Sequence, residues 1–317
     1  MGMRVFITGV AGQDGSLLAE SLLADGAEVH GLVLPGQTHP GDVILHEGDL
    51  GAGIAPIIDR VRPDVVFNLG GISSVGFSWE NPALTGLVSG QGAVGVFDAA
   101  WKLQESSGKR VSVIQASSAE VFGSPTVVPQ NERTPLAPVS PYGAAKAYAQ
   151  NVGRAYRAKG LGLTTVILYP HESTRRPEGF VTRKITSTVA RIAANGGGEL
   201  RLGNMAAVRD WGWAPDYVQA MRLAADQLQA GFDGTEYVVA TGVGHTVEQF
   251  VAAAFAAVGI DDWRNHVTVD PELFRPVDPA QLIGDASRIR AELGWEPTVD
   301  FAELVRRMCV HDLELLG

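Results

Sequence analysis

Tyr142 and Lys146 are the two side chains of this sequence whose spacing most directly indicates chemistry. They stand four positions apart in a stretch with a helical pattern, so both lie on one face of the expected helix. A phenol has a pKa near 10, roughly three units too high for a base at neutral pH. A neighbouring ammonium and the positive ring of an oxidised nicotinamide both favour the phenolate, which brings that pKa toward the working range.

Ser118 and Glu120 follow the strand-like run 111–116. Substrates of parallel sheets bind beyond the carboxyl ends of the strands, which is where both residues are expected. The Ser118 hydroxyl can hydrogen-bond a reacting oxygen, and the Glu120 carboxylate can move a proton at a carbon next to a carbonyl. The alternative for Glu120 is a solvated loop acid or a helix N-cap.

A glycine-rich loop lies between the first strand-like run and the first helical stretch. Its predicted cofactor-binding residues are Gly9, Gly12, Gln13, Asp14 and Gly15. Glycines at this spacing let the backbone turn tightly and let a pyrophosphate approach the helix N-terminus. The loop therefore predicts a dinucleotide site, with an ordinary strand-to-helix turn as the alternative.

The ends of later strands predict further cofactor contacts, at Asp49, Leu50, Leu69, Gly70 and Gly71. Asp49 can accept a hydrogen bond from the adenine amine, and the chain at 69–71 passes close to the cofactor. An acid for the ribose of NAD, or a base for the 2′-phosphate of NADP, is expected roughly 20 residues after the glycines. No Asp, Glu, Lys or Arg lies between positions 29 and 41, so the choice between NAD and NADP stays open.

The pattern of apolar runs predicts an α/β fold, a Rossmann-type doubly wound parallel sheet with a smaller mixed α/β substrate-binding domain. Buried strands are expected at 5–8, 28–33, 43–46, 65–69, 111–116 and 164–168. Helices are expected at 13–24, 54–62, 82–104, 141–159, 247–257 and 301–316. We expect residues 1–169 to form the dinucleotide-binding domain, with about 210–242 returning to it, and residues 170–317 to form mainly the smaller domain.

Composition narrows the class of protein. The chain has 317 residues, of which 45% are hydrophobic and 19% charged, as in ordinary globular proteins. Its formal net charge of −10 disfavours nucleic acid and acidic membranes as partners. No signal-peptide layout or membrane-spanning run is evident, and the single Cys309, expected in the core, agrees with a reducing compartment. We therefore expect a cytoplasmic protein, and we predict no metal site.

Short motifs along nearly the whole chain resemble the extended short-chain dehydrogenase/reductase superfamily, and most closely the GDP-mannose 4,6-dehydratases. They are the stretches 7–9, 12–16, 115–117, 140–146, 171–173, 175–176, 180–186, 202–204, 209–212, 240–242, 274–276 and 293–295. The stretches Phe-Val-Thr-Arg-Lys-Ile at 180–185 and Arg-Asp-Trp-Gly at 209–212 are typical of that family within the superfamily.

The resemblance implies an internal redox cycle on tightly bound NAD(P) that converts GDP-mannose to GDP-4-keto-6-deoxymannose. Tyr142 takes the C4 hydroxyl proton while hydride leaves C4, and Glu120 removes the C5 proton and helps water leave from C6. Hydride then returns to C6 and a proton to C5. Ser118 keeps the hydroxyl of the threonine that is usual there. The implied cofactor contacts add Tyr142, Lys146 and His171, and the implied substrate contacts are Ser73, Glu120, Glu172, Val181, Lys184, Arg209, Arg275 and Asp278.

Several positions depart from the family pattern. The family grips the NADP phosphate with basic residues after the second strand, where residues 34–37 are short and uncharged, so NADP is implied by resemblance and NAD stays possible. Pro170 replaces Asn, Ser74 replaces His, and Ala119 replaces a small hydroxyl residue. A 4-epimerase, decarboxylase or reductase on the same scaffold, and a non-catalytic dinucleotide sensor, are the alternatives. The expected partners are a nucleotide sugar and a second copy of the chain in a homodimer or tetramer.

Overall fold

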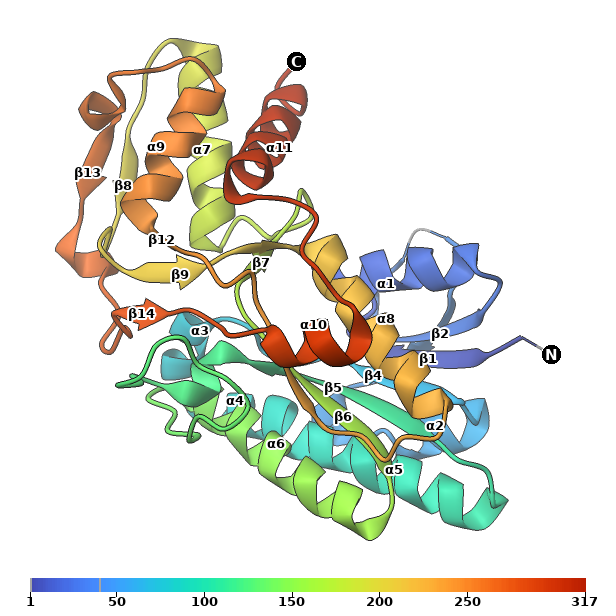
Figure 1. The fold of residues 1–317 in the computed structure, drawn as a ribbon. Helices are drawn as coiled ribbons and strands as arrows, with labels where there is room; N and C mark the ends of the chain where they lie inside the picture. The colour runs from blue at the N-terminus through green and yellow to red at the C-terminus, as the bar shows by residue number, and fades with distance from the viewer. Residues whose placement is uncertain (1, 40) are drawn as a thin grey trace.

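The centre of the molecule is a seven-stranded parallel sheet (Figure 1), in a computed structural model that describes residues 2–39 and 41–317. The strand order is β11-β6-β5-β4-β1-β2-β3. The strands are β1 (Arg4–Thr8), β2 (Glu28–Val33), β3 (Ile44–Glu47), β4 (Val65–Asn68), β5 (Ser112–Ser118), β6 (Gly162–Leu168) and β11 (Glu236–Val239). The chain runs outward from β1 to β3 and then crosses to β4, so the order reverses between β1 and β4, where such folds bind their ligands. The predicted fold class is confirmed.

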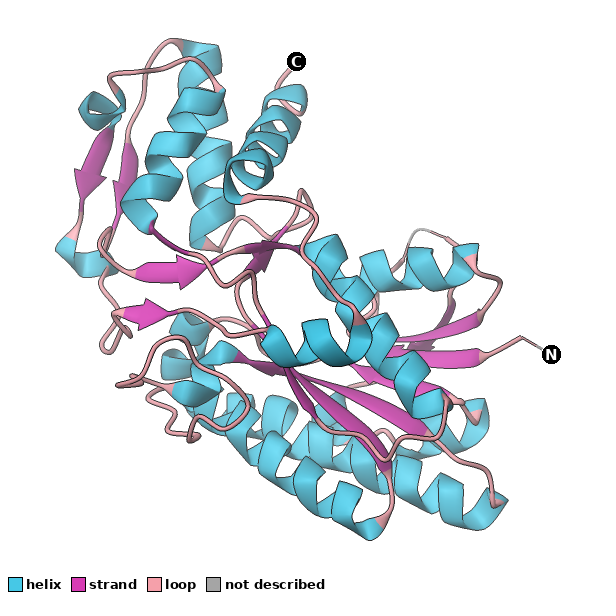
Figure 2. Ribbon diagram, in the orientation of Figure 1, coloured by secondary structure: helices cyan, strands magenta, loops and turns pink. Residues whose placement is uncertain are grey.

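Helices cover both faces of this sheet (Figure 2), which is why its strands are almost continuously apolar. The helices α1 (Gln13–Ala24) and α8 (Ala214–Gln229) pack in the core of one face. The helices α2 (Ala55–Val61), α5 (Gly92–Ser107) and α6 (Pro141–Lys159) pack in the core of the other. The predicted helix at 82–104 comprises α4 (Pro82–Thr85), a π-helical turn η2 (Gly86–Gln91) and α5.

A second group of elements lies at the carboxyl ends of the strands, an edge of the sheet that we call the carboxyl edge. Here α7 (Val181–Asn195), α9 (Val247–Ala257) and α11 (Phe301–Glu314) lie side by side around their own core (Figure 1). The short strands of this substrate-side part are β7 (His171–Glu172), β8 (Leu200–Leu202), β9 (Val208–Asp210), β10 (Gly212–Trp213), β12 (Gly244–Thr246), β13 (Val267–Val269) and β14 (Gln281–Leu282). The remaining elements are η1 (Leu50–Ala52), α3 (Val75–Glu80), η3 (Ala119–Phe122), η4 (Trp263–His266), η5 (Pro271–Leu273) and α10 (Ser287–Leu293).

Most predicted elements form within a residue or two of their expected bounds, and 13–24, 28–33, 141–159 and 247–257 match without change. The strand β11 was not among the predicted strands, although it falls inside the segment expected to return to the first domain. It pairs in parallel with β6. The core of the α1 and α8 face also contains Ile289 of α10, far along the chain. The proposed domain boundary at 169/170 stays a prediction.

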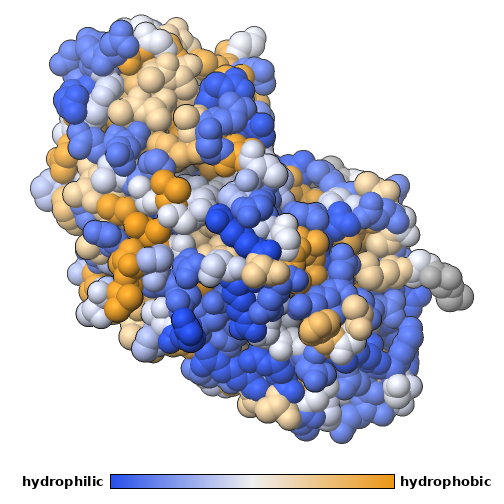
Figure 3. All heavy atoms as spheres, in the orientation of Figure 1, coloured by the Kyte–Doolittle hydropathy of each residue, from blue (hydrophilic) through white to orange (hydrophobic). Residues whose placement is uncertain are grey.

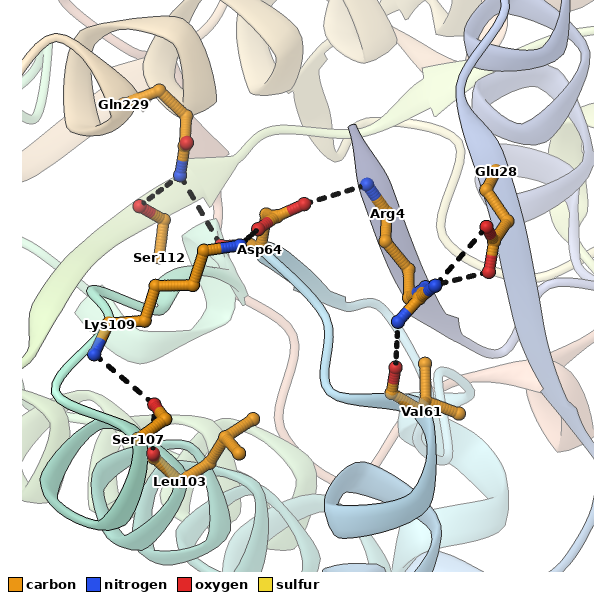
Figure 4. Close-up of polar contacts among 9 residues, drawn as sticks. All are labelled: Arg4, Glu28, Val61, Asp64, Leu103, Ser107, Lys109, Ser112 and Gln229. Carbon is orange, nitrogen blue, oxygen red and sulfur yellow. Dashed lines mark hydrogen bonds and ion pairs between the residues drawn. The ribbon is translucent and has the colours of Figure 1, made fainter. Parts of the chain in front are cut away.

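The opposite edge of the sheet, where the strands begin, is closed by side chains (Figure 4). Asp64 accepts from the backbone N–H of Arg4 at 2.9 Å and from Lys109 Nζ at 2.8 Å. The Arg4 guanidinium continues to Glu28 at 2.6 Å and to the carbonyl of Val61 at 3.0 Å. These contacts hold the first residues of neighbouring strands together and leave the carboxyl edge as the side available for ligands.

The surface is mixed in polarity (Figure 3), with apolar side chains gathered on the left of the view, where β14 lies. Between β13 and β14 the exposed apolar residues are Leu273, Phe274 and Val277. Within the described residues, no helix is long and apolar enough to cross a membrane, and no cluster of His, Cys, Asp and Glu could hold a metal ion. Cys309 is fully buried in α11, as expected for a core residue.

One buried ion pair joins α7 to α11. Arg183 Nε and Nη2 lie 2.7 and 2.6 Å from Asp312 Oδ1, and Thr186 Oγ1 donates to Asp312 Oδ2 at 2.6 Å. Both charged side chains are almost entirely buried. The substrate-side part therefore depends on each partner to neutralise the other.

We predict that Asp312→Ala lowers the free energy of unfolding by about 3–5 kcal/mol, because it leaves the Arg183 guanidinium buried without its counter-charge. Denaturant titration of the variant and the parent measures the change. The matched control is Glu248→Ala, which breaks the exposed pair with Arg264 and costs at most about 1 kcal/mol. Equal losses in the two variants would contradict the role given to the buried pair.

Candidate active site

The glycine-rich loop after β1 is built around backbone contacts that exclude side chains. Gly9 has φ +70°, and a Cβ there would lie 2.9 Å from the Cα of Gly70 in the loop after β4. A Cβ on Gly15 would lie 2.2 Å from the carbonyl oxygen of Gly9, and one on Gly12 would lie 3.2 Å from the same oxygen. No side chain caps the first turn of α1, whose N-cap is Gly12. The loop thus has the cradle shape that a pyrophosphate requires.

Asp14 and His171 form an ion pair between this loop and β7. His171 Nε2 lies 2.8 Å from Asp14 Oδ2, and His171 Nδ1 lies 2.7 Å from the carbonyl of Tyr169. Burial alone would raise the pKa of Asp14, but the charge and hydrogen bond of His171 outweigh it and lower that pKa. Burial by itself would lower the pKa of His171. The charge and the hydrogen bond of Asp14 have a larger opposite effect, so the pKa of His171 is raised. Both residues were predicted at the cofactor, whereas their pairing was not.

Gln13 also joins the glycine loop to the segment around β7. Its amide donates to Asp14 Oδ1 at 3.0 Å and to the carbonyl of His171 at 3.1 Å, and its oxygen accepts from Ser173 Oγ at 2.9 Å. The first turn of α1 is therefore attached to the segment that leads from the sheet into the substrate-side part.

The ends of β3 and β4 lie against the glycine loop. A Cβ on Gly70 would lie 2.8 Å from Leu50 Cδ1 and 3.0 Å from Thr8 Oγ1, so Leu50 fills the space beneath this turn. Thr8 Oγ1 donates to Asn68 Oδ1 at 2.7 Å and accepts from the N–H of Gly70 at 2.9 Å. Asp49 caps η1 by accepting from the N–H of Gly51 at 2.7 Å. The predicted residues Leu69 and Gly71 flank Gly70 in this turn.

Tyr142 and Lys146 point from α6 toward the carboxyl edge. Both are more than nine-tenths buried, and Lys146 Nζ lies 6.0 Å from the centre of the Tyr142 ring. Lys146 Nζ donates to the carbonyl of Ala116 on β5 at 2.9 Å. Ser140 caps α6 by accepting from the N–H of Gly143 at 3.0 Å, which sets where the helix begins. The expected shared face is confirmed.

Burial dominates the pKa values of this pair in the protein without a cofactor. Burial raises the pKa of Tyr142 to about 12, and a hydrogen bond with Ser118 opposes that rise only in part. Burial also lowers the pKa of Lys146 to about 8. The lysine ammonium therefore does not by itself bring the phenol into the working range, because desolvation of the phenolate is the stronger effect.

Ser118 and Glu120 follow β5 as predicted. Ser118 is the last residue of that strand and caps η3, since its Oγ accepts from the N–H of Glu120 at 3.3 Å. Glu120 is thus neither an N-cap nor a solvated acid, and its side chain is only 13% exposed. Burial raises the pKa of Glu120, with Arg275 and Arg209 opposing the rise. A carboxyl group whose pKa is raised holds its proton more readily than a solvated one.

Asp278 brings two arginines of the substrate-side part together near Glu120. Arg209 Nη2 donates to Asp278 Oδ1 at 2.6 Å, and Arg275 Nη1 lies 3.6 Å from the same oxygen. Arg275 Nη1 also lies 4.0 Å from Glu120 Oε1. Arg209 Nη1 also donates to the carbonyls of Val208 and Pro279, so Arg275, whose side chain is 40% exposed, is the guanidinium of the two that is more available to an anion such as a diphosphate. The contact of Arg209 with a diphosphate stays a prediction.

The other predicted substrate residues lie along the entry to α7. Glu172 is buried and pairs with Arg176 at 3.0 Å, and burial raises the pKa of Glu172. The charge of Arg176 lowers the pKa of Tyr142, so this pair lies near the catalytic phenol. Val181 is the first residue of α7 and is exposed, and Lys184 is half-buried one turn later.

Two residues differ in their contacts from what the motifs indicate. Ser73 is exposed, and its neighbour Ser74 caps α3 by accepting from the N–H of Phe77 at 3.2 Å. Arg183, in the stretch expected to line the substrate site, turns instead to Asp312 on α11. Across residues 2–39 and 41–317 no hydrogen bond or ion pair joins Ser73, Val181 or Lys184 to the catalytic side chains. Their substrate contacts remain predictions.

Comparison with known proteins matches nearly the whole chain to one family. The family model described as GDP-mannose 4,6 dehydratase matches residues 6–308. The relative named GDP-mannose 4,6 dehydratase 2 from Arabidopsis thaliana is 42% identical over 98% of this chain and 86% of that protein. GDP-mannose 4,6 dehydratase from Cricetulus griseus is 39% identical over 98% of this chain and 91% of its own length.

Solved structures agree with the fold. The UDP-glucose 4-epimerase of Thermus thermophilus, in complex with NAD, superposes with a TM-score of 0.84 at 27% identity, over 98% of this chain and 99% of that one. The structure of RMD from Pseudomonas aeruginosa, complexed with NADPH, gives a TM-score of 0.80 at 21% identity, over 99% of both chains. The latter similarity concerns the fold alone.

The buried ammonium generates a prediction about stability. Lys146 keeps its proton up to a pKa of 10.5 in the unfolded chain but only to about 8 in the folded one, a difference of about 3 kcal/mol. The unfolded chain binds more protons between these values, so this group makes the folded state more stable as pH rises from about 8 to about 10.5. We predict that Lys146→Met raises the free energy of unfolding by up to about 3 kcal/mol at pH 7, and that the gain shrinks above pH 8.

Denaturant titrations at several pH values measure that difference. The control is Lys102→Met, which removes an exposed lysine of α5 that pairs with Asp98. The same pH dependence in both variants, or a gain for Lys146→Met that does not change with pH, would argue against the burial of this ammonium.

Proposed function

Because the chain belongs to the GDP-mannose 4,6-dehydratase family, we propose that it converts GDP-mannose to GDP-4-keto-6-deoxymannose on a bound nicotinamide dinucleotide. The observation that supports this most directly is the convergence of Tyr142, Ser118 and Glu120 at the carboxyl edge, beside the glycine loop and the two arginines held by Asp278. A proton acceptor, a second acid–base group and an anion site are the parts that this reaction needs.

The cofactor fits the residues present. Side chains are excluded at Gly9 and Gly15 by backbone contacts, and this leaves the cradle for the pyrophosphate. We propose that this loop with Gln13, Asp14 and His171, the turn at 69–71, and Lys146 hold the dinucleotide. A bound nicotinamide would supply the acceptor for the C4 hydride and the source of the same hydride for C6, so the cycle would leave its redox state unchanged.

The protein's own side chains move the protons. Tyr142 takes the proton of the C4 hydroxyl as C4 is oxidised, and Ser118 orients that oxygen through its hydroxyl. The resulting ketone acidifies the C5 hydrogen, which Glu120 removes. Glu120 then passes this proton to the C6 hydroxyl, which leaves as water. When hydride enters C6, C5 takes the proton that Tyr142 received from the C4 hydroxyl, so both side chains return to their starting state. The raised pKa of the buried Glu120 suits both halves of this transfer, and Arg209 and Arg275 bind the diphosphate.

An epimerase or a reductase on the same scaffold is the competing activity. The similarity to a UDP-glucose 4-epimerase structure keeps epimerisation as the second candidate. A buried carboxyl group at position 120 favours dehydration, because epimerisation at C4 needs no proton transfer at C5. The two outcomes differ in mass, since only the dehydratase product is lighter than the substrate by one water.

We further propose a cytoplasmic homodimer formed through α6, the helix that carries Tyr142 and Lys146, and through the neighbouring α4 and η2. Exposed apolar side chains lie on α4, η2 and α6, at Leu84, Leu87 and Tyr148. Apolar side chains on adjacent helices favour pairing of those helices with a second copy. A second pair of contacts, giving a tetramer, remains open.

We predict that Glu120→Gln abolishes formation of the keto sugar while dinucleotide affinity stays within about twofold, because the amide keeps the shape but cannot accept the C5 proton. Mass spectrometry of the nucleotide sugar after incubation measures the loss of one water, and titration with dinucleotide measures binding. Tyr142→Phe is the comparison variant, since it blocks the preceding oxidation and also gives no keto sugar.

The two variants separate the steps. With Glu120→Gln, oxidation at C4 still produces an absorbance change of the reduced nicotinamide on mixing with substrate, and with Tyr142→Phe it does not. Dehydration at a normal rate in Glu120→Gln would remove Glu120 from the mechanism.

A further inference from the structure

We propose that Glu47 makes the protein select NAD over NADP, by placing a carboxylate where the 2′ position of the adenosine ribose lies. The inference rests on the proposed function to the extent that the chain binds a nicotinamide dinucleotide. Glu47 lies outside the glycine loop and outside positions 29–41, where the sequence predicts the ribose contact.

The ribose position follows from the packing of the first two strands. Thr8, the last residue of β1, pairs with Leu32 of β2, so the chain leaving β2 runs beside the glycine loop. A Cβ on Gly31 would lie 2.4 Å from Val10 Cγ1, which shows how closely β2 and this loop pack. With the pyrophosphate on the loop, the adenosine ribose of a dinucleotide lies over the end of β2.

Glu47 lies next to the end of β2, on the neighbouring strand. It is the last residue of β3 and pairs with Val33, the last residue of β2. Its Oε1 accepts a hydrogen bond from the N–H of Gly36, in the turn that follows β2, at 3.3 Å. The turn after β2 contains no acidic residue, and the carboxylate beside it comes from Glu47 of β3.

The charged residues of the segment 28–50 favour binding of NAD over NADP. Between positions 28 and 50 there is no Lys or Arg, while Glu28, Asp42, Glu47 and Asp49 are acidic. Glu28 lies at the opposite end of β2 and is paired with Arg4. The acids of this segment that remain for the carboxyl edge are Asp42, Glu47 and Asp49. A carboxylate accepts hydrogen bonds from ribose hydroxyls, but it repels a 2′-phosphate, which carries nearly two negative charges at pH 8.

The nearest basic side chain of β3 does not offset this repulsion. His46 Nε2 is hydrogen-bonded with His30 Nδ1 at 2.9 Å, and burial lowers the pKa of His46. At pH 8 this imidazole is neutral. β3 therefore offers a 2′-phosphate the exposed Glu47 carboxylate and no cation, and the charge of Arg60 on α2 acts on His46.

Equilibrium titration of the full chain with NAD⁺ and with NADP⁺, at pH 8 and low salt and without substrate, tests the proposal. We expect the Kd for NADP⁺ to be at least about tenfold higher than that for NAD⁺. In Glu47→Gln the amide oxygen still accepts from the N–H of Gly36 while the charge is gone, so the ratio should fall about fivefold, mainly through tighter NADP⁺ binding. Added salt should narrow the parent's ratio, because exposed charges are screened.

The matched control is Glu105→Gln, which removes an exposed carboxylate near the end of α5 and should leave both Kd values unchanged. Equal affinity of the parent for the two dinucleotides, or the same ratio in Glu47→Gln as in the parent, overturns the assignment to Glu47. Binding of neither dinucleotide overturns the proposed function as well, so the two failures are distinguishable.

Discussion

The burial of a phenol and an ammonium together at the carboxyl edge is the constraint on which the site depends. Tyr142 and Lys146 lose most of their contact with water on α6, and burial disfavours the charged form of each. A cationic nicotinamide bound beside Tyr142 would favour its phenolate, which is the role that we propose for the cofactor. The Ser140 cap and the Lys146 bond to β5 anchor the helix that carries both side chains.

Most of the fold follows from local patterns. The Val- and Ile-rich runs at 28–33 and 65–69 and the amphipathic stretch at 141–159 identify their elements because burial on two faces or on one face leaves distinct periodicities. The catalytic pair was equally predictable, since an i and i+4 spacing on a helix fixes a shared face. The strand β11 was missed because four residues at a sheet edge carry too short a pattern, and tertiary pairing with β6 decides their structure.

The contacts that were not predictable join residues far apart in the sequence. Asp14 and His171 meet only after the segment following β6 returns to the first turn of α1. Asp278 meets Arg209 through the pairing of β14 with β9. Glu47 lies beside the turn after β2 because two strands pair in register. In each case the sequence shows a residue of the required type. Which residue it contacts depends on how the strands pair, and this cannot be read from the sequence. Spacing also indicates that Lys146 lies near Tyr142 but not that both side chains lose contact with water, so the rise in the Tyr142 pKa could not be read from the sequence.

The central claim is that one active site oxidises C4, removes the C5 proton and reduces C6 of the same sugar. Incubation in ordinary water with GDP-mannose carrying deuterium at C4, followed by mass and NMR analysis of the product, tests it most directly. We predict that the deuterium appears at C6 of the 4-keto-6-deoxy sugar while C5 takes its hydrogen from solvent. Deuterium retained at C4, or lost to solvent with none at C6, would contradict the claim.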